Sequence, residues 1–375
     1  MTYGTVNADT LVTSTSGGIL GAGDASIMKN RIINGAMVIS QRNGTSSITQ
    51  DATGTQYSLD RFVLYGTVAG KFTAQQNAGS VTPPVGFTNY LGITSTSAYS
   101  VGASDQYLVC QKIEGYNIAD LGWGTANAKT VTVSFWVYSS LTGTFSGSLR
   151  NGASTFYSYP FTYSIPTANT WTQISVTIAG STAGTWASTT SSGIEVYFNL
   201  GAGSSNTAAS GAWTTGSYTG ANSSVSVVGT NGATFYIAGV QLEVGSSATG
   251  FEYVNYQTSL ANCQRYYWKI GGGVDGGSAV YAGVGSGVSN GGTTARIAFP
   301  MNTQMRTSPT ISFGGTIYVY DPGVATVSSI STIYGGRQTG LVEFTTSNAL
   351  TSGHGAICFT GSTNPTDFVS GSSEL

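Results

Sequence analysis

The amino-acid sequence predicts an all-β protein in which a β-sandwich is followed by one short helix and a smaller β domain. Turn signals such as NG, GG and SG recur at intervals of roughly ten residues, between runs of Val, Ile, Thr, Tyr and Phe. Within these runs apolar and polar residues alternate, as expected for strands that bury one face. Helical periodicity is confined to one segment, which predicts the single helix.

Four segments show the strand pattern most clearly. In TVTVSFWVYSS, the apolar residues of Val131–Val137 are predicted to face the core. WTQISVTIAG and GIEVYFNLG repeat this pattern, with apolar positions over Ile174–Ile178 and Ile194–Leu200. FYIAGVQLE adds a fourth strand, whose Gln241 and Glu243 are predicted to point outward.

The one predicted helix follows the last strand of the sandwich. NYQTSLANCQRYYWKIG places Leu260, Cys263 and Tyr267 on one face, with Ser259 or Thr258 as the N-cap. The run of glycines at 271–273 predicts its end. We therefore expect four parts, which are an N-terminal arm (1–30), a β-sandwich (31–255), a helical connector (256–273) and a C-terminal β domain (274–375).

Composition indicates a folded chain with an uncharged polar surface. The chain has 375 residues, of which 40% are hydrophobic and only 7% are charged, and its net charge is −2. Disordered chains usually combine low hydrophobicity with high net charge, so we expect this one to fold. Nucleic-acid binding needs clustered Lys and Arg, which are not visible here, so we expect no nucleic-acid partner.

Targeting signals and reactive motifs are not visible in the sequence. The first residues lack the basic and apolar regions of a signal peptide, and no apolar stretch approaches the length of a membrane span. Cys110, Cys263 and Cys358 are too widely spaced for a zinc site, so we expect free thiols. His354 is the only histidine, which limits histidine chemistry to that position. We expect no cofactor and no metal site.

A candidate carbohydrate site lies on the outward positions of the strands. Trp136 and Tyr138, with Glu195 and Tyr197, are predicted to place aromatic rings and hydrogen-bonding groups on one sheet face. Sugars bind such faces because their apolar ring faces stack on aromatic side chains while their hydroxyls need polar partners. The alternative is that Trp136 packs beneath a loop or at a subunit boundary.

Glycosidic cleavage would need two carboxylates about 5 to 9.5 Å apart. The candidates are Glu114, Asp120, Glu195 and Glu343, and the sequence pairs none of them. We therefore expect no enzymatic activity.

Six blocks of sequence occur in order between about residues 29 and 270. They are KNRIINGAMVISQRNG (Lys29–Gly44), YSLDRF (Tyr57–Phe62), QKIEGYN (Gln111–Asn117), AKTVTVSFWV (Ala128–Val137), FYIAGVQLEVGSSATGFEY (Phe235–Tyr253) and CQRYYWK (Cys263–Lys269). Together they resemble the jelly-roll module of phage fibre and appendage proteins, notably those of marine bacteriophages and cyanophages. The opening MTYGTVNADT and the final DFVSGSSEL also resemble the ends of such virion proteins.

The resemblance implies a bacteriophage virion protein, a tail or head fibre that assembles in the host bacterial cytoplasm. Its N-terminal arm would attach to other virion proteins. Such fibres are commonly trimers, and we predict that Tyr266, Tyr267 and Trp268 contact neighbours in a homotrimer. The alternative is that these rings cover the end of their own sandwich.

The module also looks like carbohydrate-binding jelly rolls, which implies recognition of glycans on the host surface. Those modules often hold a calcium ion on an Asp of the last strand, where this chain has Ala238 and Gly239. Two other functions remain open at this point. One is a capsid decoration or cement protein, and the other is a polysaccharide-degrading tailspike.

Overall fold

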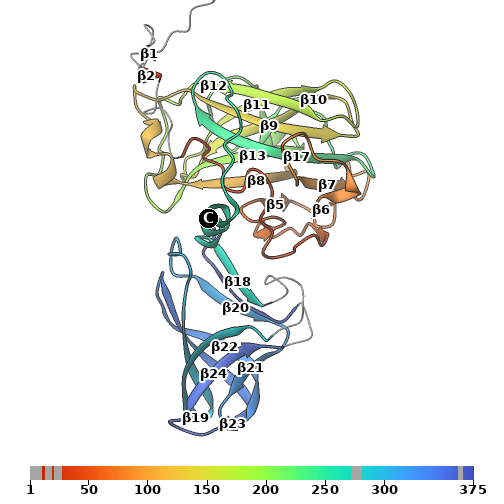
Figure 1. Cartoon of the computed structure of the whole chain (residues 1–375). Coiled ribbons are helices and arrows are strands. Elements are labelled where there is room, and N and C mark those ends of the chain that lie inside the picture. Colours follow the sequence, from red (N-terminus) through yellow and green to blue (C-terminus); the bar gives the residue numbers. More distant parts are fainter. Residues whose placement is uncertain (1–10, 13–18, 21–27, 272–280, 362–365) are drawn as a thin grey trace, which may run out of the picture.

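The structure is a computed structural model that describes residues 11–12, 19–20, 28–271, 281–361 and 366–375. A broad β-sandwich lies above a narrower β-barrel in Figure 1, with a helix between them. The predicted all-β fold, a jelly-roll β-sandwich followed by a short helix and a smaller C-terminal β unit, is confirmed. The arm predicted over residues 1–30 lies mostly outside the described residues, although β1 (Leu11–Val12) pairs with β2 (Ile19–Leu20).

Two antiparallel sheets form the sandwich. In spatial order, the six-stranded sheet consists of β12 (Thr172–Ile178), β9 (Val131–Ser139), β17 (Thr234–Val244), β7 (Leu91–Ser95), β6 (Phe72–Gln76) and β3 (Ile48–Thr49). The seven-stranded sheet consists of β15 (Thr214–Thr215), β11 (Tyr157–Ile165), β10 (Gly143–Asn151), β13 (Ser192–Ala202), β8 (Gln106–Glu114), β5 (Val63–Gly66) and β4 (Gln56–Tyr57). A short parallel pair, β14 (Thr207–Ala208) and β16 (Gly220–Ala221), completes this unit.

The predicted apolar stripes meet between these two sheets. The alternating apolar residues of β9 and β13 are almost completely buried and belong to one hydrophobic cluster. Ile174 and Ile178 of β12 join this cluster, and Val176 packs against it. Each fully buried aliphatic side chain stabilises the fold by roughly 1.5 to 3 kcal/mol, so these stripes account for the sandwich.

Gln241 and Glu243 lie on the outer face of β17, as predicted, while Val240 and Leu242 join the core, but this outer face is covered by other parts of the chain. The side chains of Gln241 and Glu243 are 0% and 1% exposed. The residues that follow the strand fold back over it, because Glu243 accepts hydrogen bonds from Thr249 and Gln241 accepts one from the backbone N–H of Glu252. Asn30 also donates to the Val240 carbonyl from the other side, at 3.0 Å.

The helix is shorter than predicted. Helix α1 spans Tyr256–Gln264, and its N-cap is Asn255, whose side chain accepts from the backbone N–H of Thr258. The prediction is wrong beyond Gln264, because β18 (Tyr267–Gly271) pairs with β25 (Phe368–Ser372) near the end of the chain. Of the glycine stop expected at 271–273, Gly271 ends strand β18 and residues 272–273 lie outside the described residues.

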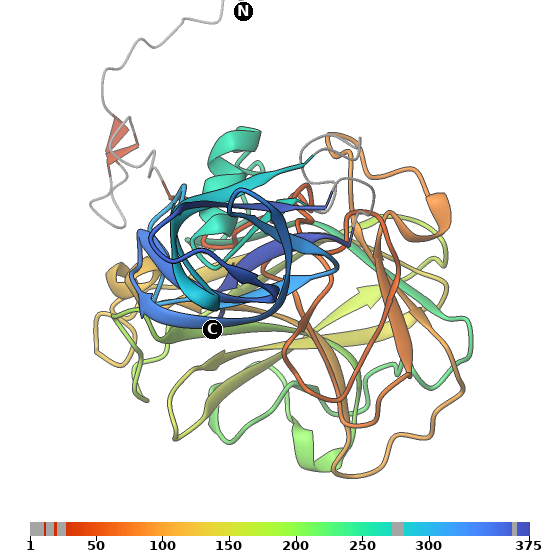
Figure 2. The ribbon, with the colours of Figure 1, turned by 90° about the horizontal axis from the view of Figure 1, so that it is seen from below.

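The lower unit is a closed barrel with its own core. Its strands, in order, are β19 (Gly283–Pro300), β23 (Thr339–Leu350), β22 (Val324–Gly335), β21 (Ile317–Tyr320) and β24 (Gly355–Thr360). A second hydrophobic cluster fills it. A three-stranded sheet of β18, β25 and β20 (Thr310–Gly314) adjoins it. Seen from below in Figure 2, the barrel strands curl into a ring that is smaller than the sandwich behind it.

Buried ion pairs join the sandwich to the end of the chain. Glu374 pairs with Arg61, which is only 2% exposed, and with Arg42 at 3.0 Å. Arg306, which precedes β20, donates to the carbonyl of Thr190 in the sandwich at 2.9 Å. The upper unit is therefore completed by Arg306, which lies between barrel strands β19 and β21 in sequence, and by Glu374, which follows the last barrel strand.

Candidate functional site

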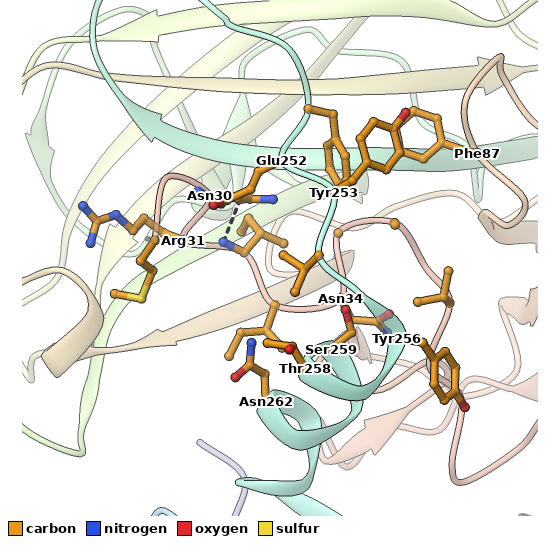
Figure 3. Close-up of a pocket in the computed structure, with 18 of the residues that line it drawn as sticks. Asn30, Arg31, Asn34, Phe87, Glu252, Tyr253, Tyr256, Thr258, Ser259 and Asn262 are labelled. Atoms are coloured by element: carbon orange, nitrogen blue, oxygen red, sulfur yellow. Dashed lines mark hydrogen bonds between the residues drawn. The ribbon is translucent and has the colours of Figure 1, made fainter. Parts of the chain in front are cut away.

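A cavity of about 470 Å³ opens on the side of the sandwich next to α1 (Figure 3). Four parts of the chain line it, which are residues 28–38, the loop 86–88, Asn117 and the stretch from Phe251 to Arg265. Cavities of roughly 300 to 1,000 Å³ hold small ligands in proteins. Most of these lining residues belong to the segments that cover the outer face of β17.

Two glycines allow these segments to approach one another. Gly239 lies where β17 shifts register against β9, with φ +59°, and a Cβ there would lie 2.5 Å from the ring of Phe87. Gly35 packs directly against the carbonyl of Val240. Any larger residue at either position would push a wall of the cavity away from β17.

One wall of the cavity is aromatic. The ring centroids of Phe87, Phe251 and Tyr253 lie 5.0 to 5.7 Å apart. Tyr253 is 62% exposed, although aromatic rings of this size are usually buried or half-buried. In Figure 3 Phe87 and Tyr253 stand together at the edge of the cavity. This wall offers ring faces to a ligand.

The opposite wall carries hydroxyl and amide groups. Thr258, Ser259 and Asn262 share one face of α1, and Figure 3 shows their side chains rising toward the segment that contains Asn34. Within the described ranges, none of these three side chains makes a hydrogen bond, since the contact from Thr258 to Asn255 uses its backbone N–H. These donors and acceptors are therefore available to a ligand.

The arginines at the base of the cavity are neutralised by the protein itself. Arg31 pairs with Asp120 at 2.7 Å, and Arg265 pairs with Glu114 at 2.6 Å. Burial acts to raise the pKa of Glu114, but hydrogen bonds from Arg265 and Tyr266 outweigh it and lower that pKa. The hydrogen bonds that Arg265 donates to the Glu114 carboxylate raise the pKa of Arg265 in turn. The site is therefore suited to an uncharged ligand.

Asn30 and Glu252 join two of the segments that line the cavity. The backbone N–H of Asn30 donates to the Glu252 carboxylate at 2.6 Å. The side-chain oxygen of Asn30 accepts from the backbone N–H groups of Ile32 and Leu242, at 2.9 and 3.1 Å. Because Asn30 makes hydrogen bonds both to Ile32 in its own segment and to Leu242 in β17, it holds residues 28–38 against β17.

The predicted ligand residues Trp136 and Tyr138 lie elsewhere, on the outer face of the six-stranded sheet. Tyr138 stacks on Tyr236 at 5.3 Å with an interplanar angle of 5°. Tyr90 and Trp171 extend this group of rings, and the Trp171 indole donates to the loop that contains η1 (Ala78–Ser80). Both predicted residues are half-buried. Their role in sugar binding stays a prediction.

Glu195 and Tyr197 belong to the seven-stranded sheet, so the prediction of one shared face with Trp136 and Tyr138 is wrong. They are 5% and 4% exposed. Arg150 and the Tyr197 hydroxyl both donate to the Glu195 carboxylate. Burial raises the pKa of Tyr197 well above its ordinary value. Trp136 and Tyr138 lie on a different face from Glu195 and Tyr197 because strands β9 and β13, which have similar sequence patterns, are in opposite sheets.

The aromatic residues predicted to contact neighbouring subunits are buried within one chain. Tyr266, Tyr267 and Trp268 are 0%, 7% and 6% exposed. Arg61 and Arg42 each lie 3.6 Å from the ring centroid of Tyr266 and Tyr267, respectively. Trp268 packs against Phe299 of the barrel at 5.5 Å. Tyr266 and Tyr267 therefore cover the end of their own sandwich, which was the alternative, whereas Trp268 belongs to the barrel core. All three leave little surface for a second chain.

All four carboxylates considered for glycosidic cleavage are paired with arginine. The pairs are Glu114 with Arg265, Asp120 with Arg31, Glu195 with Arg150 and Glu343 with Arg296. A general acid needs a raised pKa, whereas the pKa of Glu114 is lowered, because hydrogen bonds from Arg265 and Tyr266 outweigh the effect of burial.

Two further properties concern metals and membranes. Within the described ranges, no group of three or more His, Cys, Asp and Glu side chains is arranged to hold a metal ion. In the same ranges, no helix has the length and apolar character needed to cross a membrane.

No protein-family model and no curated protein matches the chain. Among solved structures, it is similar to the enzymatically active domain of tailspike protein 4 of bacteriophage CBA120, with 13% identity and a TM-score of 0.30. That alignment covers 58% of this chain and 22% of the tailspike chain.

Carbohydrate-binding proteins are also among the similar structures. The family 11 carbohydrate-binding module of Clostridium thermocellum has 10% identity and a TM-score of 0.27, over 56% of this chain and 100% of the module. A CBM4 structure has 15% identity and a TM-score of 0.28, over 56% and 98% of the two chains.

The cavity residues were not predicted from the sequence. The stretch GFEYVNYQTSLANC contains both walls, with Phe251 and Tyr253 on one side and Thr258, Ser259 and Asn262 on the other. The feature of this stretch that could have indicated a site is a pair of alternating aromatic residues shortly before a helix whose exposed face carries small polar side chains. That feature does not identify Phe87 or residues 28–38, which reach the cavity through non-local contacts.

Proposed function

We propose that this chain binds carbohydrate in the cavity beside α1. The observation that carries the proposal is the opposition of an aromatic wall, Phe87 with Tyr253, to unengaged hydroxyl and amide groups on α1. A sugar ring has apolar faces and a polar rim, so it needs these two kinds of contact at once.

The aromatic wall and the polar wall of the cavity would contact different parts of the sugar. The apolar face of one sugar ring stacks on Tyr253, whose exposure leaves its ring available. Ring hydroxyls then exchange hydrogen bonds with Thr258, Ser259 and Asn262. Because Arg31 and Arg265 already have carboxylate partners, a neutral glycan is a better ligand than an acidic one.

We further propose that the protein is part of a bacteriophage virion, as a fibre or appendage of the tail or head that contacts glycans on the host surface. The resemblance of the sequence blocks between residues 29 and 270 supports this role. In this proposal the N-terminal residues attach to other virion proteins, and assembly takes place in the host bacterial cytoplasm. The sparse charge suits a protein exposed outside the cell.

The same proposal includes a homotrimer and no enzymatic activity. Because Tyr266, Tyr267 and Trp268 are buried within one chain, the trimer contact would use other residues. The arginine partners of Glu114, Asp120, Glu195 and Glu343 support binding without cleavage.

Glycan-array binding by the full chain tests the carbohydrate proposal. We expect Tyr253→Ala and Asn262→Ala to weaken binding at least about tenfold, as loss of a stacking ring or a central polar contact does. Tyr218→Ala is the matched control, because this half-buried tyrosine lies outside the cavity, between β15 and β16. Unchanged circular dichroism would show that the variants fold. Equal binding by all four proteins would overturn the cavity as the site.

The virion proposal is tested separately. Antibody labelling of intact phage particles in electron micrographs should mark a fibre or appendage, and particles without the protein would overturn the proposal. Deleting residues 1–27 should abolish incorporation into particles. Release of reducing sugar from host polysaccharide by the purified chain would instead establish a tailspike enzyme.

A further inference from the structure

The outer face of the barrel carries an aromatic notch. Tyr318 of β21 and Phe359 of β24 are directly opposite in register, and their ring centroids lie 5.5 Å apart with an interplanar angle of 36°. Tyr281, two residues before β19, meets the same Phe359 ring at 5.5 Å and an angle of 78°. Tyr318 and Phe359 thus form a floor, and Tyr281 stands against it as a wall.

Gly283 leaves the space beside this wall open. It pairs with Phe359 in the barrel, so a side chain at Gly283 would lie on the same outward face as the ring. Among the described residues, no heavy atom lies within 4 Å of a Cβ placed at this position. Almost any other residue would fill the notch that glycine leaves empty.

The notch is exposed and carries no charge. Tyr281 is 63% exposed, and Tyr320, two residues from Tyr318 on the same face, is 47% exposed. Residues 281–288, 317–320 and 355–360 include no Asp, Glu, Lys, Arg or His. Within the described ranges, the phenol hydroxyls of Tyr281, Tyr318 and Tyr320 make no hydrogen bond. The surface therefore combines accessible ring faces with unused polar groups.

We infer that this notch is a second carbohydrate-binding site, which takes one neutral sugar ring. The apolar face of the sugar stacks on Phe359 and Tyr318, its edge lies in the space beside Gly283, and its hydroxyls reach the three phenols. A second copy of this chain is the other occupant that an exposed apolar face could accept. The empty space at Gly283 and the unused hydroxyls favour the sugar, because a flat protein interface needs neither.

The inference rests on the proposed function, since the ligand class is the same, and it adds a second point of contact. One site lies beside α1 and the other on the barrel (Figure 1). A long polysaccharide that reaches both sites would be held by two weak contacts. Linked contacts of this kind can exceed the affinity of either one by 100-fold or more, roughly, without any new interaction.

The test uses the full chain and three neutral probes, which are maltohexaose, cellohexaose and chitohexaose. Saturation-transfer NMR measures how much magnetisation each hexamer receives from the protein. Gly283→Leu should block the notch without strain, because its backbone is in an ordinary conformation and the space is open. Gly355→Leu is the matched control, since Gly355 is also in open space on the barrel but lies four residues from Phe359 on β24.

We expect Gly283→Leu and Tyr253→Ala each to remove roughly half of the transfer for a bound hexamer, and the double variant to remove nearly all of it, as for two distant sites. Gly355→Leu should match the wild type. A Gly283→Leu variant that binds like the wild type, while Tyr253→Ala binds nothing, would overturn the second site and leave the cavity in place. Loss only in Gly283→Leu would overturn the cavity instead.

Two further results would count against the notch. No transfer to any hexamer from the wild type would overturn both sites together. Sedimentation measures whether the chain associates through this face. A fall in molecular mass in Gly283→Leu, but not in Gly355→Leu, would identify the notch as an interface between copies of the chain and overturn the sugar site.

Discussion

Gly239 and Phe87 fit together, with the ring of Phe87 occupying the space that a side chain at Gly239 would need. Because Gly239 has φ +59°, Gly239→Ala adds backbone strain as well as a clash with Phe87. We expect the free energy of unfolding to fall by about 2 to 3 kcal/mol and carbohydrate binding to weaken. Urea denaturation and glycan-array binding measure the two effects.

Gly232→Ala separates strain from the clash. Gly232 has φ +73°, and a Cβ there would meet nothing within 4 Å. This variant should lose only about 1 kcal/mol and bind carbohydrate normally. Equal losses in both variants would show that the fit between Gly239 and Phe87 does not shape the cavity.

The pair formed by Glu374 and Arg61 predicts a large effect on stability. Glu374→Ala leaves a buried guanidinium without its carboxylate, so we expect the free energy of unfolding to fall by about 3 kcal/mol or more. Glu343→Ala is the control, because its partner Arg296 is half exposed and such pairs contribute less than about 1 kcal/mol. Similar losses in both variants, measured by urea denaturation, would contradict the prediction.

Glu114 predicts a dependence of stability on pH. Its pKa is lowered in the folded protein from an ordinary value of 4.5, so its contribution is present above about pH 4.5. That contribution is lost as the pH falls through the folded pKa. Glu114→Gln should therefore be less stable than the wild type at pH 7, and the difference should shrink on acidification.

Urea denaturation at a series of pH values measures this difference. Groups that titrate alike in both proteins cancel in the comparison. A stability difference that stays constant from pH 7 to about pH 3 would show that the Arg265 and Tyr266 contacts do not lower the pKa of Glu114.

Tyr138 distinguishes the sheet face from the cavity. Tyr138→Ala removes the stacked contact with Tyr236, so the free energy of unfolding should fall by about 1 to 2 kcal/mol. With the cavity as the site, carbohydrate binding stays at the wild-type level. A loss of binding as large as that of Tyr253→Ala would move the site to the six-stranded sheet.

The three cysteines should be unreactive in the folded protein. All three are free thiols with less than 2% exposure. Burial raises the pKa of Cys358 to about 12, and it also raises those of Cys110 and Cys263. A colorimetric thiol reagent at pH 8 should react with none of them until denaturant is added. Rapid reaction of the native protein would contradict this burial.

The sequence was most informative where structure is local. Alternation in β9, β12 and β13 identified the inner faces correctly, because period-two burial is a property of each strand alone. It could not show that Gln241 and Glu243 are covered, since the covering segments contact β17 through non-local hydrogen bonds. The outward residues of a strand are thus exposed only if nothing else folds over them.

Non-local contacts also explain why the end of the helix and the position of the site were not predicted correctly. Tyr267 fits the apolar face of a helix by spacing, but pairing with β25, about a hundred residues later, makes it a strand. Trp136 and Glu195 alternate in similar strands, and only the sheet order separates them. The cavity combines residues from four regions, so no single stretch of sequence contains it.

The ion pair between Arg61 and Glu374 can form only late in the synthesis of the chain. The two residues are 313 positions apart, which corresponds to roughly 15 to 60 seconds of translation. During that interval the nascent sandwich carries a guanidinium whose carboxylate has not yet been made. Arg61 can therefore gain its carboxylate partner only after every strand of the barrel has been made, so this contact is among the last that complete the sandwich.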